Sequence, residues 1–311
     1  MRLASAGQGE RQTVSKHNFW RAAVGVLAVL ILGAVVRNQV KVYQGRQVRA
    51  AQKQQHHPVR PEPPEAVEQR RRLFDMLQPV AIRNCSLQRF GEAHDGGYLM
   101  CAKLLGDVQA GYSYGIGGYD GWGCDISRAL DLVVHQYDCF NTTRPWCVFG
   151  DTAFHEACVG DAAETVDGRA FDTVEGQVAA NRDGAKRIVL KMDVEGAEWD
   201  SLLAIPEHTL ARIDQLAVEF HWIEDAHHRW VQDDRYVRTV QRLREFFEIA
   251  HIHFNNTSCI GDLAPFPASV YEVLFVSRRL AVVDPSRRVG GPHPLDAPNN
   301  PSLPDCAPAP R

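Results

Sequence analysis

Residues 187–200 read Arg187-Ile188-Val189-Leu190-Lys191-Met192-Asp193-Val194-Glu195-Gly196-Ala197-Glu198-Trp199-Asp200, and this stretch decides the fold. An apolar run ends in two carboxylates and a glycine, and a helix-favouring segment follows at once. This pattern is typical of a buried parallel strand, which delivers its last side chains to the carboxyl edge of an α/β sheet, where ligands bind. The stretch therefore predicts both the fold class and the place of the chemistry.

Strands and helices alternate on both sides of this stretch. Expected strands cover 108–114, 133–138, 154–159, 188–193 and 216–221, and expected helices cover 126–132, 173–181, 197–204 and 234–247. Two more strands, 249–254 and 270–276, follow with no helix between them. The alternation predicts an α/β fold with a mostly parallel sheet and right-handed crossovers, and the final pair predicts an antiparallel edge hairpin.

Composition divides the chain of 311 residues into segments of different character. A basic N-terminal segment (1–21) precedes an apolar run (22–36), and a polar stalk rich in proline and glutamine (37–71) follows. The folded domain is expected over 72–280, and a disordered, proline-rich tail is expected over 281–311. The net charge of −4 gives no overall basic signal, so nucleic acid is not an expected partner.

The apolar run at 22–36 contains no charged or strongly polar residue. At roughly 15 residues it is shorter than the about 20 that a full membrane span needs, and Phe19 and Trp20 can extend it. An uncleaved signal anchor is the favoured interpretation. A cleaved signal peptide is the main alternative, and a buried core helix is the third. Basic residues flank the run on both sides in near balance, so charge does not decide its orientation.

All eight cysteines follow the apolar run, and an even count there suits an oxidising compartment, although the sequence leaves their pairing open. N-glycosylation sequons begin at Asn84, Asn141, Asn255 and Asn256, which predicts a glycoprotein. Together with the leader, these features predict the lumenal domain of a single-pass type II membrane protein of the secretory pathway. A secreted protein is expected if the leader is cleaved.

A glycine turn follows the first expected strand of the sheet. Gly115 and Gly117 come directly after that strand, where glycines let a ligand approach the backbone closely. Asp138 lies about 20 residues further on, at the end of the next strand, and this spacing suits a carboxylate that accepts hydrogen bonds from ribose hydroxyls. The alternative is a turn residue at the surface. The dinucleotide pattern G-x-G-x-x-G is not met, which disfavours a nicotinamide enzyme.

Asp193 and Glu195 share one face of the extended segment with Lys191. Asp193 can position an amine or hydroxyl of a substrate, accept a proton, or bind a divalent ion. The alternative for both carboxylates is capping of the helix that follows, because negative charge is favourable at a helix N-terminus.

Glu219 and His221 stand two residues apart at the end of the next strand and therefore share a face. With Asp193 they are expected to form an acid/base cluster, or a metal cluster as the alternative, and Asp193, Glu219 and His221 are the candidate catalytic residues. No metal is assigned to the site. The other alternative is a set of edge polar residues that bond to nearby loops.

Several motifs occur in the order of a known family: Phe90-Gly91, His94-Asp95-Gly96-Gly97-Tyr98, Tyr112-Ser113-Tyr114-Gly115-Ile116-Gly117 and Leu190-Lys191-Met192-Asp193-Val194-Glu195-Gly196-Ala197-Glu198-Trp199. Together they resemble the methyltransferase-like protein 24 group, whose domain is related to the FkbM-type methyltransferases. The resemblance covers about residues 80–280. It implies a Rossmann-like class I methyltransferase fold with a seven-stranded sheet that uses S-adenosylmethionine. By position, Gly115 and Gly117 would flank the methionine end of this cofactor and Asp138 would hold its ribose.

The leading hypothesis is an S-adenosylmethionine-dependent methyltransferase of the secretory pathway. Its acceptor would be a small molecule, a protein or a glycan, and the FkbM-type relationship favours an oxygen atom. The membrane is a further partner if the N-terminal segment stays uncleaved. One alternative is a Golgi-type glycosyltransferase, because Asp193-Val194-Glu195 resembles a D-x-D metal motif. The other is a catalytically inactive cofactor-binding domain.

Overall fold

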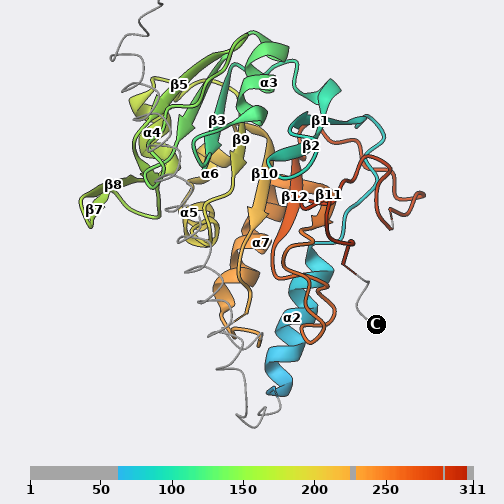
Figure 1. Cartoon of the computed structure of the whole chain (residues 1–311). Coiled ribbons are helices and arrows are strands. Elements are labelled where there is room, and N and C mark those ends of the chain that lie inside the picture. The colour runs from blue at the N-terminus through green and yellow to red at the C-terminus, as the bar shows by residue number, and fades with distance from the viewer. Residues whose placement is uncertain (1–61, 225–228, 290, 307–311) are drawn as a thin grey trace, which may run out of the picture. The chain divides into compact units, whose positions relative to one another are not determined.

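The computed structural model describes residues 62–224, 229–289 and 291–306 (Figure 1). The chain divides into two compact units, Met1–Arg60 and Pro61–Arg311, and the first lies wholly outside the described residues. The expected basic segment, the expected anchor and most of the expected stalk fall in that first unit. Among the described residues, no helix has the length and the apolar content that crossing a bilayer requires.

A seven-stranded sheet forms the centre of the second unit, in the order β11-β12-β10-β9-β3-β4-β5 (Figure 1). Its strands are β3 (Ala110–Tyr114), β4 (Val133–Tyr137), β5 (Asp151–His155), β9 (Ile188–Met192), β10 (Ile213–Phe220), β11 (Phe247–Phe254) and β12 (Tyr271–Ser277). The pairs from β5 through β10 are parallel, whereas β12 is antiparallel to both β10 and β11. This confirms the α/β fold with a mostly parallel sheet and an antiparallel pair at one edge.

The order of the strands creates a switch point at β3. In the sheet, β3 lies between β4 and β9. The connection after β3 leads to β4 on one side, and the connection after β9 leads to β10 on the other side. The two connections therefore diverge at the carboxyl edge of the sheet. Ligands bind in such a crevice in open α/β sheets.

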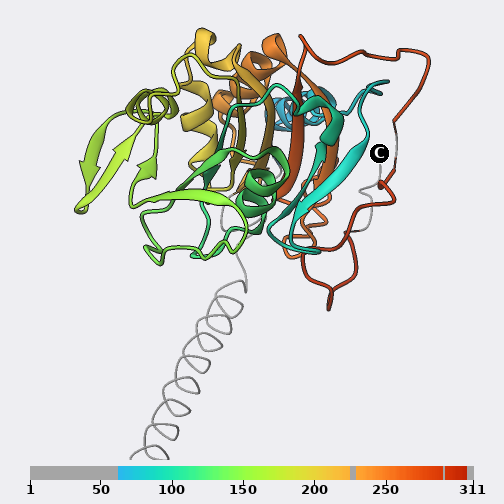
Figure 2. The same ribbon diagram turned by 90° about the horizontal axis from the view of Figure 1, so that it is seen from above.

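Helices cover both faces of the sheet. They are α2 (Pro64–Met76), α3 (Gly121–Leu130), α4 (Val174–Ala180), α5 (Glu198–Leu203), α6 (Glu207–Leu210) and α7 (Asp234–Phe246), with a short 3-10 turn η1 (Ala102–Leu104). In Figure 2 the green helix α3 and the teal strands β1 (Leu87–Gly91) and β2 (Gly97–Cys101) lie on one side of the sheet, and the yellow and orange helices lie on the other. Strands β6 (Cys158–Val159), β7 (Glu164–Val166) and β8 (Arg169–Asp172) form a separate small sheet.

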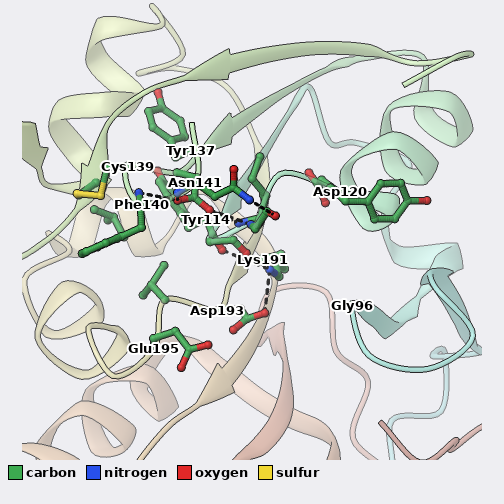
Figure 3. A pocket seen from close by; sticks show the side chains of 18 of the residues that line it. Gly96, Tyr114, Asp120, Tyr137, Cys139, Phe140, Asn141, Lys191, Asp193 and Glu195 are labelled. Carbon is green, nitrogen blue, oxygen red and sulfur yellow. Dashed lines mark hydrogen bonds and ion pairs between the residues drawn. A yellow bond between two sulfur atoms is a disulfide. The ribbon is translucent and has the colours of Figure 1, made fainter. Parts of the chain in front are cut away.

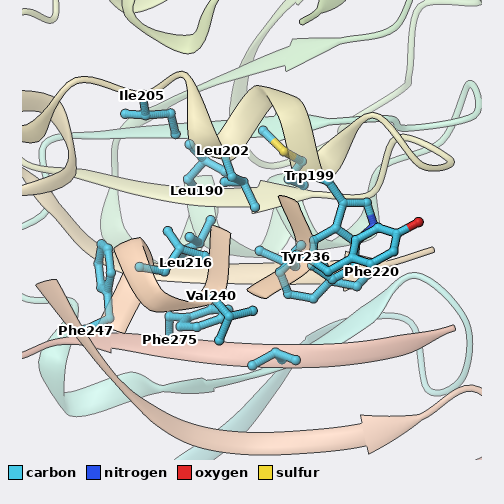
Figure 4. Close-up of a cluster of buried hydrophobic side chains, with 14 of the residues drawn as sticks. Leu190, Trp199, Leu202, Ile205, Leu216, Phe220, Tyr236, Val240, Phe247 and Phe275 are labelled. Atoms are coloured by element: carbon cyan, nitrogen blue, oxygen red, sulfur yellow. The ribbon is translucent and has the colours of Figure 1, made fainter. Parts of the chain in front are cut away.

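The core has two halves because successive strand residues point to opposite faces. Leu190 packs with the cluster under α5 and α7, whereas its neighbour Val189 packs with the cluster under α3. The first cluster contains the indole of Trp199, which stacks on Phe220 at 4.2 Å between ring centroids (Figure 4). Both faces of β9 are therefore covered, which explains the successive apolar residues Ile188, Val189 and Leu190 in its sequence.

Two expected boundaries are wrong. The strand expected over 154–159 is split, because β5 ends at His155 and β6 begins at Cys158 in a different sheet. The helix expected over 126–132 begins earlier, at Gly121, where the Asp120 carboxylate caps it by accepting a hydrogen bond from the Gly123 amide at 2.8 Å. Glycine is a poor helix former, so helix propensity does not predict this first turn. The N-cap residue Asp120 is the local signal for it.

The expected stalk overlaps the folded unit. Residues 64–71 lie in α2, which packs against α7, and the Arg70 side chain is only 4% exposed. Its guanidinium forms an ion pair with Glu62 at 2.7 Å and donates a hydrogen bond to the Ala264 carbonyl at 2.8 Å. Sequence composition alone suggests solvation, but these long-range partners fix the helix to the domain.

The expectation of a disordered tail over 281–311 is also wrong for its described part, up to residue 306. The Asp284 amide donates to the Ala81 carbonyl at 2.8 Å, and Nε2 of His251 lies 2.8 Å from Oδ1 of Asp296. A disulfide joins Cys306 to Cys259. The segment has little apolar content, so covalent and polar contacts hold it in place of a hydrophobic face.

All eight cysteines pair, as Cys85–Cys101, Cys124–Cys147, Cys139–Cys158 and Cys259–Cys306. Disulfides form and persist mainly in oxidising compartments, and the lumenal or secreted location stays a prediction. Two of the four predicted glycosylation sequons, those that begin at Asn255 and Asn256, do not suit glycosylation of the folded domain. Asn255 and Asn256 are buried, and their side-chain amides donate hydrogen bonds inward. Asn141 is exposed.

The double variant Cys259→Ser/Cys306→Ser is expected to lose about 2 kcal/mol of unfolding free energy, because the bridge restricts the unfolded chain. It is also expected to speed hydrogen exchange across 291–306, where the Asn300 amide is bonded to Asn256. Urea unfolding and exchange mass spectrometry measure the two effects. The matched control Cys124→Ser/Cys147→Ser should leave exchange in 291–306 unchanged, and an equal response in both variants would contradict the expectation.

Candidate functional site

A cavity of about 700 Å³ opens at the carboxyl ends of β3, β4 and β9 (Figure 3). Its walls come from the loops that follow these strands and from the loop between β1 and β2. Apolar and acidic side chains alternate around it, and the lining includes Glu92, Asp95, Gly115, Ile116, Gly117, Asp120, Asp138, Phe140, Asn141, Val159, Lys191, Asp193 and Glu195. The position is the one that the carboxylate-ended strand at 188–193 predicts.

The glycine turn after β3 crosses the end of β9 at very short range. Gly115 has φ +71°, and a Cβ atom there would lie 1.6 Å from the Asp193 carbonyl oxygen. Only glycine fits at this crossing, since any side chain would overlap the neighbouring backbone. Gly117 also has a positive φ, +56°, but a Cβ atom there would meet no atom within 4 Å. The first glycine is therefore required by packing, and the second leaves open space.

Asp138 ties two loops of the cavity wall together. Its Oδ2 accepts hydrogen bonds from the amides of Ile116 (3.2 Å) and Gly117 (2.8 Å). Its Oδ1 accepts from the amides of Phe140 and Asn141, both at 2.9 Å. A carboxylate offers about four lone-pair sites, so these backbone amides occupy all the hydrogen-bond acceptor sites of Asp138. A ribose hydroxyl can bind Asp138 only in exchange for one of these bonds.

Asp193 is held in place by two partners on one oxygen. Its Oδ2 accepts a hydrogen bond from the Tyr98 hydroxyl at 3.0 Å and forms an ion pair with the Lys191 ammonium at 3.1 Å (Figure 3). The Lys191 ammonium also donates to the Gly115 carbonyl at 2.7 Å, which links the acid to the glycine turn. Burial opposes the charge of Lys191, but the nearby carboxylates of Asp193 and Asp120 outweigh it and raise the pKa of this lysine.

No side chain of the described residues caps the helix that follows, α5, whose N-cap residue is Ala197, and Glu198 instead holds the turn that precedes it. The Glu198 carboxylate, which is fully buried, accepts hydrogen bonds from the amides of Val194 (2.7 Å) and Gly196 (2.9 Å). Asp193 points to Tyr98 and Lys191 instead, so capping is wrong for it. Glu195 is 72% exposed on its side chain and its backbone has φ +56°, yet its Oε2 lies 3.8 Å from Nε2 of His221, the same distance as Oδ1 of Asp193. Both acids of the D-x-E segment therefore approach His221, Asp193 from a largely buried position and Glu195 from the solvent side.

The structure brings Asp193, Glu219 and His221 together. One oxygen or nitrogen atom of each lies within 4.8 Å of the others. The Nε2 atom of His221 is 3.8 Å from Oδ1 of Asp193, and its Nδ1 is 3.0 Å from Oε1 of Glu198. Glu219 is 3% exposed and accepts a hydrogen bond from the Asn255 side-chain amide at 2.7 Å.

Burial and charge perturb both buried members of this cluster. Burial, together with the negative charges of Asp193 and Glu272, raises the pKa of Glu219 well above its ordinary value. Burial alone would lower the pKa of His221, but its hydrogen bond to Glu198 and the charges of Glu198 and Glu219 outweigh burial and raise this pKa to about 9. The pKa values of a neighbouring acid and base are thus both raised, and strongly perturbed pKa values cluster at functional sites.

Three residues of the site escaped prediction. Tyr98 and Glu198 were named only within the motifs of the family resemblance, and Asn255 only as the start of a sequon. Each reaches the cluster from a distant or differently interpreted segment, and no sequence spacing joins them to it. Gly115, Gly117 and Asp138, which were predicted, all line the cavity.

Comparison with known proteins adds no relative from which a role could be transferred. No family model, no curated protein and no solved structure matches the chain. The function is therefore argued from the geometry of the cavity, the glycine turn and the cluster of Asp193, Glu219 and His221.

Proposed function

We propose that this protein is an S-adenosylmethionine-dependent methyltransferase with a class I methyltransferase fold. The observation that carries the proposal is the glycine turn at the switch point of the sheet, which borders a ligand-sized cavity and is bonded through Lys191 to the acid of an adjoining cluster. The seven-stranded sheet and the motif resemblance over residues 80–280 support the same assignment.

The residues of the cavity fit this cofactor. A volume of about 700 Å³ lies within the range of small-molecule sites, roughly 300–1,000 Å³. Ile116, Phe140 and Val159 offer apolar wall for an adenine ring, and the carboxylates of Glu92 and Asp120 suit a ligand that carries positive charge. Asp138 is placed for the ribose, provided that one of its backbone bonds is exchanged for a ribose hydroxyl.

The bound cofactor supplies a methyl group on a positively charged sulfur. The chain supplies position and proton handling. The glycine turn sets how close a ligand can come to the ends of β3 and β9, and positioning accounts for much of the barrier to an in-line displacement. Asp193, steadied on Oδ2 by Tyr98 and Lys191, keeps Oδ1 available to accept the proton of an acceptor hydroxyl. We therefore favour an oxygen acceptor, on a small molecule, protein or glycan of the secretory pathway.

Thermal unfolding of the full-length protein with candidate ligands tests the proposal. S-adenosylmethionine and S-adenosylhomocysteine should each raise Tm, since a ligand at 100 times its Kd stabilises by about 2.7 kcal/mol. NAD, and sugar nucleotides with Mn²⁺, should leave Tm unchanged. Ala157→Trp, which fills the cavity wall, should abolish the shift, and Ala163→Trp, the same change at an exposed position outside the lining, should keep it.

Each rival function gives a different result in this assay. A shift with sugar nucleotides and Mn²⁺ alone would replace the methyltransferase by a glycosyltransferase. A shift with S-adenosylmethionine, without methyl transfer to any acceptor from a secretory-pathway extract, would indicate an inactive cofactor-binding domain. A shift that survives Ala157→Trp would place the ligand outside this cavity.

A further inference from the structure

We infer that Asp193, Glu219 and His221 form a divalent-cation site beside the cavity. They end two adjacent parallel strands, β9 and β10, so the sheet itself brings their side chains to one edge. One potential ligand atom of each lies within 4.8 Å of the others. Ligands at neighbouring octahedral positions lie about 3.0 Å apart when each metal–ligand distance is near 2.1 Å, so the three side chains must move toward one another when an ion binds.

His221 is oriented as a metal ligand. Its Nδ1 faces the Glu198 carboxylate at 3.0 Å, and because a carboxylate accepts, Nδ1 carries the hydrogen. Glu198 cannot swing away, because the amides of Val194 and Gly196 hold it. A histidine that donates one ring N–H to a fixed carboxylate while the other nitrogen faces outward is the arrangement that supports metal ligands.

The second ring nitrogen of His221, Nε2, faces two carboxylates at a distance longer than a hydrogen bond. Its side chain is 8% exposed, and within the part of the chain that the structure describes, Nε2 has no hydrogen-bond partner. The nearest acidic oxygens, on Asp193 and Glu195, are each 3.8 Å away, which is too long for a hydrogen bond. A ring nitrogen with two carboxylate oxygens at 3.8 Å is spaced for an ion that all three atoms could bind.

In both Asp193 and Glu219, one carboxylate oxygen is bound by neighbouring side chains and the other is less constrained. Asp193 uses Oδ2 for Tyr98 and Lys191, and Oδ1 faces His221. Glu219 uses Oε1 for Asn255, and its Oε2 has only a long contact of 3.5 Å with the Tyr98 hydroxyl. Each acid therefore has one oxygen fixed by the protein and one left to coordinate.

The donor set indicates the class of ion. Two carboxylate oxygens and one imidazole are suitable ligands for Mn²⁺ or Zn²⁺. A metal that prefers thiolate ligands would bind this donor set less well. Three protein ligands leave open positions, and Asp193 lies in the cavity wall, so these positions are accessible from the cavity. The role in catalysis rests on the proposed function. A hydroxyl bound there would release its proton to water more easily, because a divalent ion lowers the hydroxyl pKa, and Asp193 would then be a ligand rather than the base.

Calorimetric titration of EDTA-dialysed full-length protein with MnCl₂ alone tests the site. Wild type should bind one ion per chain, and His221→Gln and Asp193→Asn should each weaken binding at least about tenfold. His155→Gln, the same change at a histidine on β5, should bind as wild type does. Circular dichroism and Tm show whether each variant is folded, and Asp193→Asn, at a partly exposed position, backs up the buried His221 variant.

Two outcomes would overturn the inference: no Mn²⁺ binding by wild type at millimolar concentration, or equal binding by wild type, His221→Gln and Asp193→Asn. Neither depends on the cofactor. Thermal shifts with S-adenosylmethionine in the presence of EDTA test the proposed function separately. A cofactor shift without metal binding would remove the cation site alone, and metal binding without a cofactor shift would remove the methyltransferase assignment alone.

Discussion

Gly115→Ala is expected to lower the free energy of unfolding by about 3 kcal/mol or more and to abolish ligand binding in the cavity. The added Cβ atom would lie 1.6 Å from the Asp193 carbonyl oxygen, and the backbone there has φ +71°. Since neither backbone segment has a flexible end that can yield, the turn and the end of β9 must separate. Urea unfolding measures the stability, and calorimetry with S-adenosylhomocysteine measures the binding.

Gly117→Ala is the matched control for this prediction. It has the same chemical change and a similar positive φ, +56°, but its Cβ atom would meet no atom within 4 Å. Only the cost of the left-handed backbone remains, about 1–2 kcal/mol. If both variants lose the same stability, the close crossing of Gly115 and Asp193 does not constrain the fold.

The sheet was predictable because its central strands carry their signal locally. β9 and β10 are buried along their whole length, and each contains a short apolar stretch, residues 188–190 and 216–218, that is followed by polar residues near the strand end. The final two strands were predictable as an antiparallel pair because no helix separates them. The split between β5 and β6 was not, since both pieces have the same extended character and only their partners differ.

The candidate site was predictable only where it follows strand ends. Asp193, Glu219 and His221 converge because adjacent parallel strands end at one edge, which periodicity and order reveal. Glu195 was expected on the same face as Asp193, but the positive φ of Glu195 breaks the alternation of the strand. Tyr98 and Asn255 enter from segments far away in the sequence, and such contacts depend on the packed fold rather than on local pattern.

The order of the described tail, up to residue 306, also could not be predicted from local sequence pattern. Its composition predicts disorder because it offers no apolar periodicity. It is nevertheless fixed by a disulfide from Cys306, by the pairing of Asp296 with His251, and by the Asn299 amide, which donates to Glu272 at 2.8 Å. Composition measures the hydrophobic contribution to order and does not register specific polar and covalent bonds.

Glu198→Ala is expected to cost about 3–5 kcal/mol of unfolding free energy, because it removes a fully buried carboxylate from its hydrogen-bond partners. The variant takes the acceptor from the partly buried amides of Val194 and Gly196, and it leaves the Nδ1–H group of His221 with only the Glu219 carbonyl at 3.2 Å. Each unsatisfied buried group costs about 1–3 kcal/mol. Urea unfolding followed by tryptophan fluorescence measures the loss, because Trp199 is buried beside the changed residue.

Glu198→Gln and Glu195→Gln separate the roles of the two neighbouring acids. Glutamine at 198 keeps one acceptor oxygen but presents an N–H group to one of the three donors, so we expect a smaller loss of stability and a Mn²⁺ affinity lowered about 10- to 100-fold through the misaligned imidazole. Glutamine at 195, on a side chain 72% exposed, should change stability by less than about 0.5 kcal/mol. Wild-type Mn²⁺ affinity in Glu198→Gln would show that Glu198 supports the turn alone, whereas a selective loss of metal binding with the fold intact would identify it as the residue that orients His221.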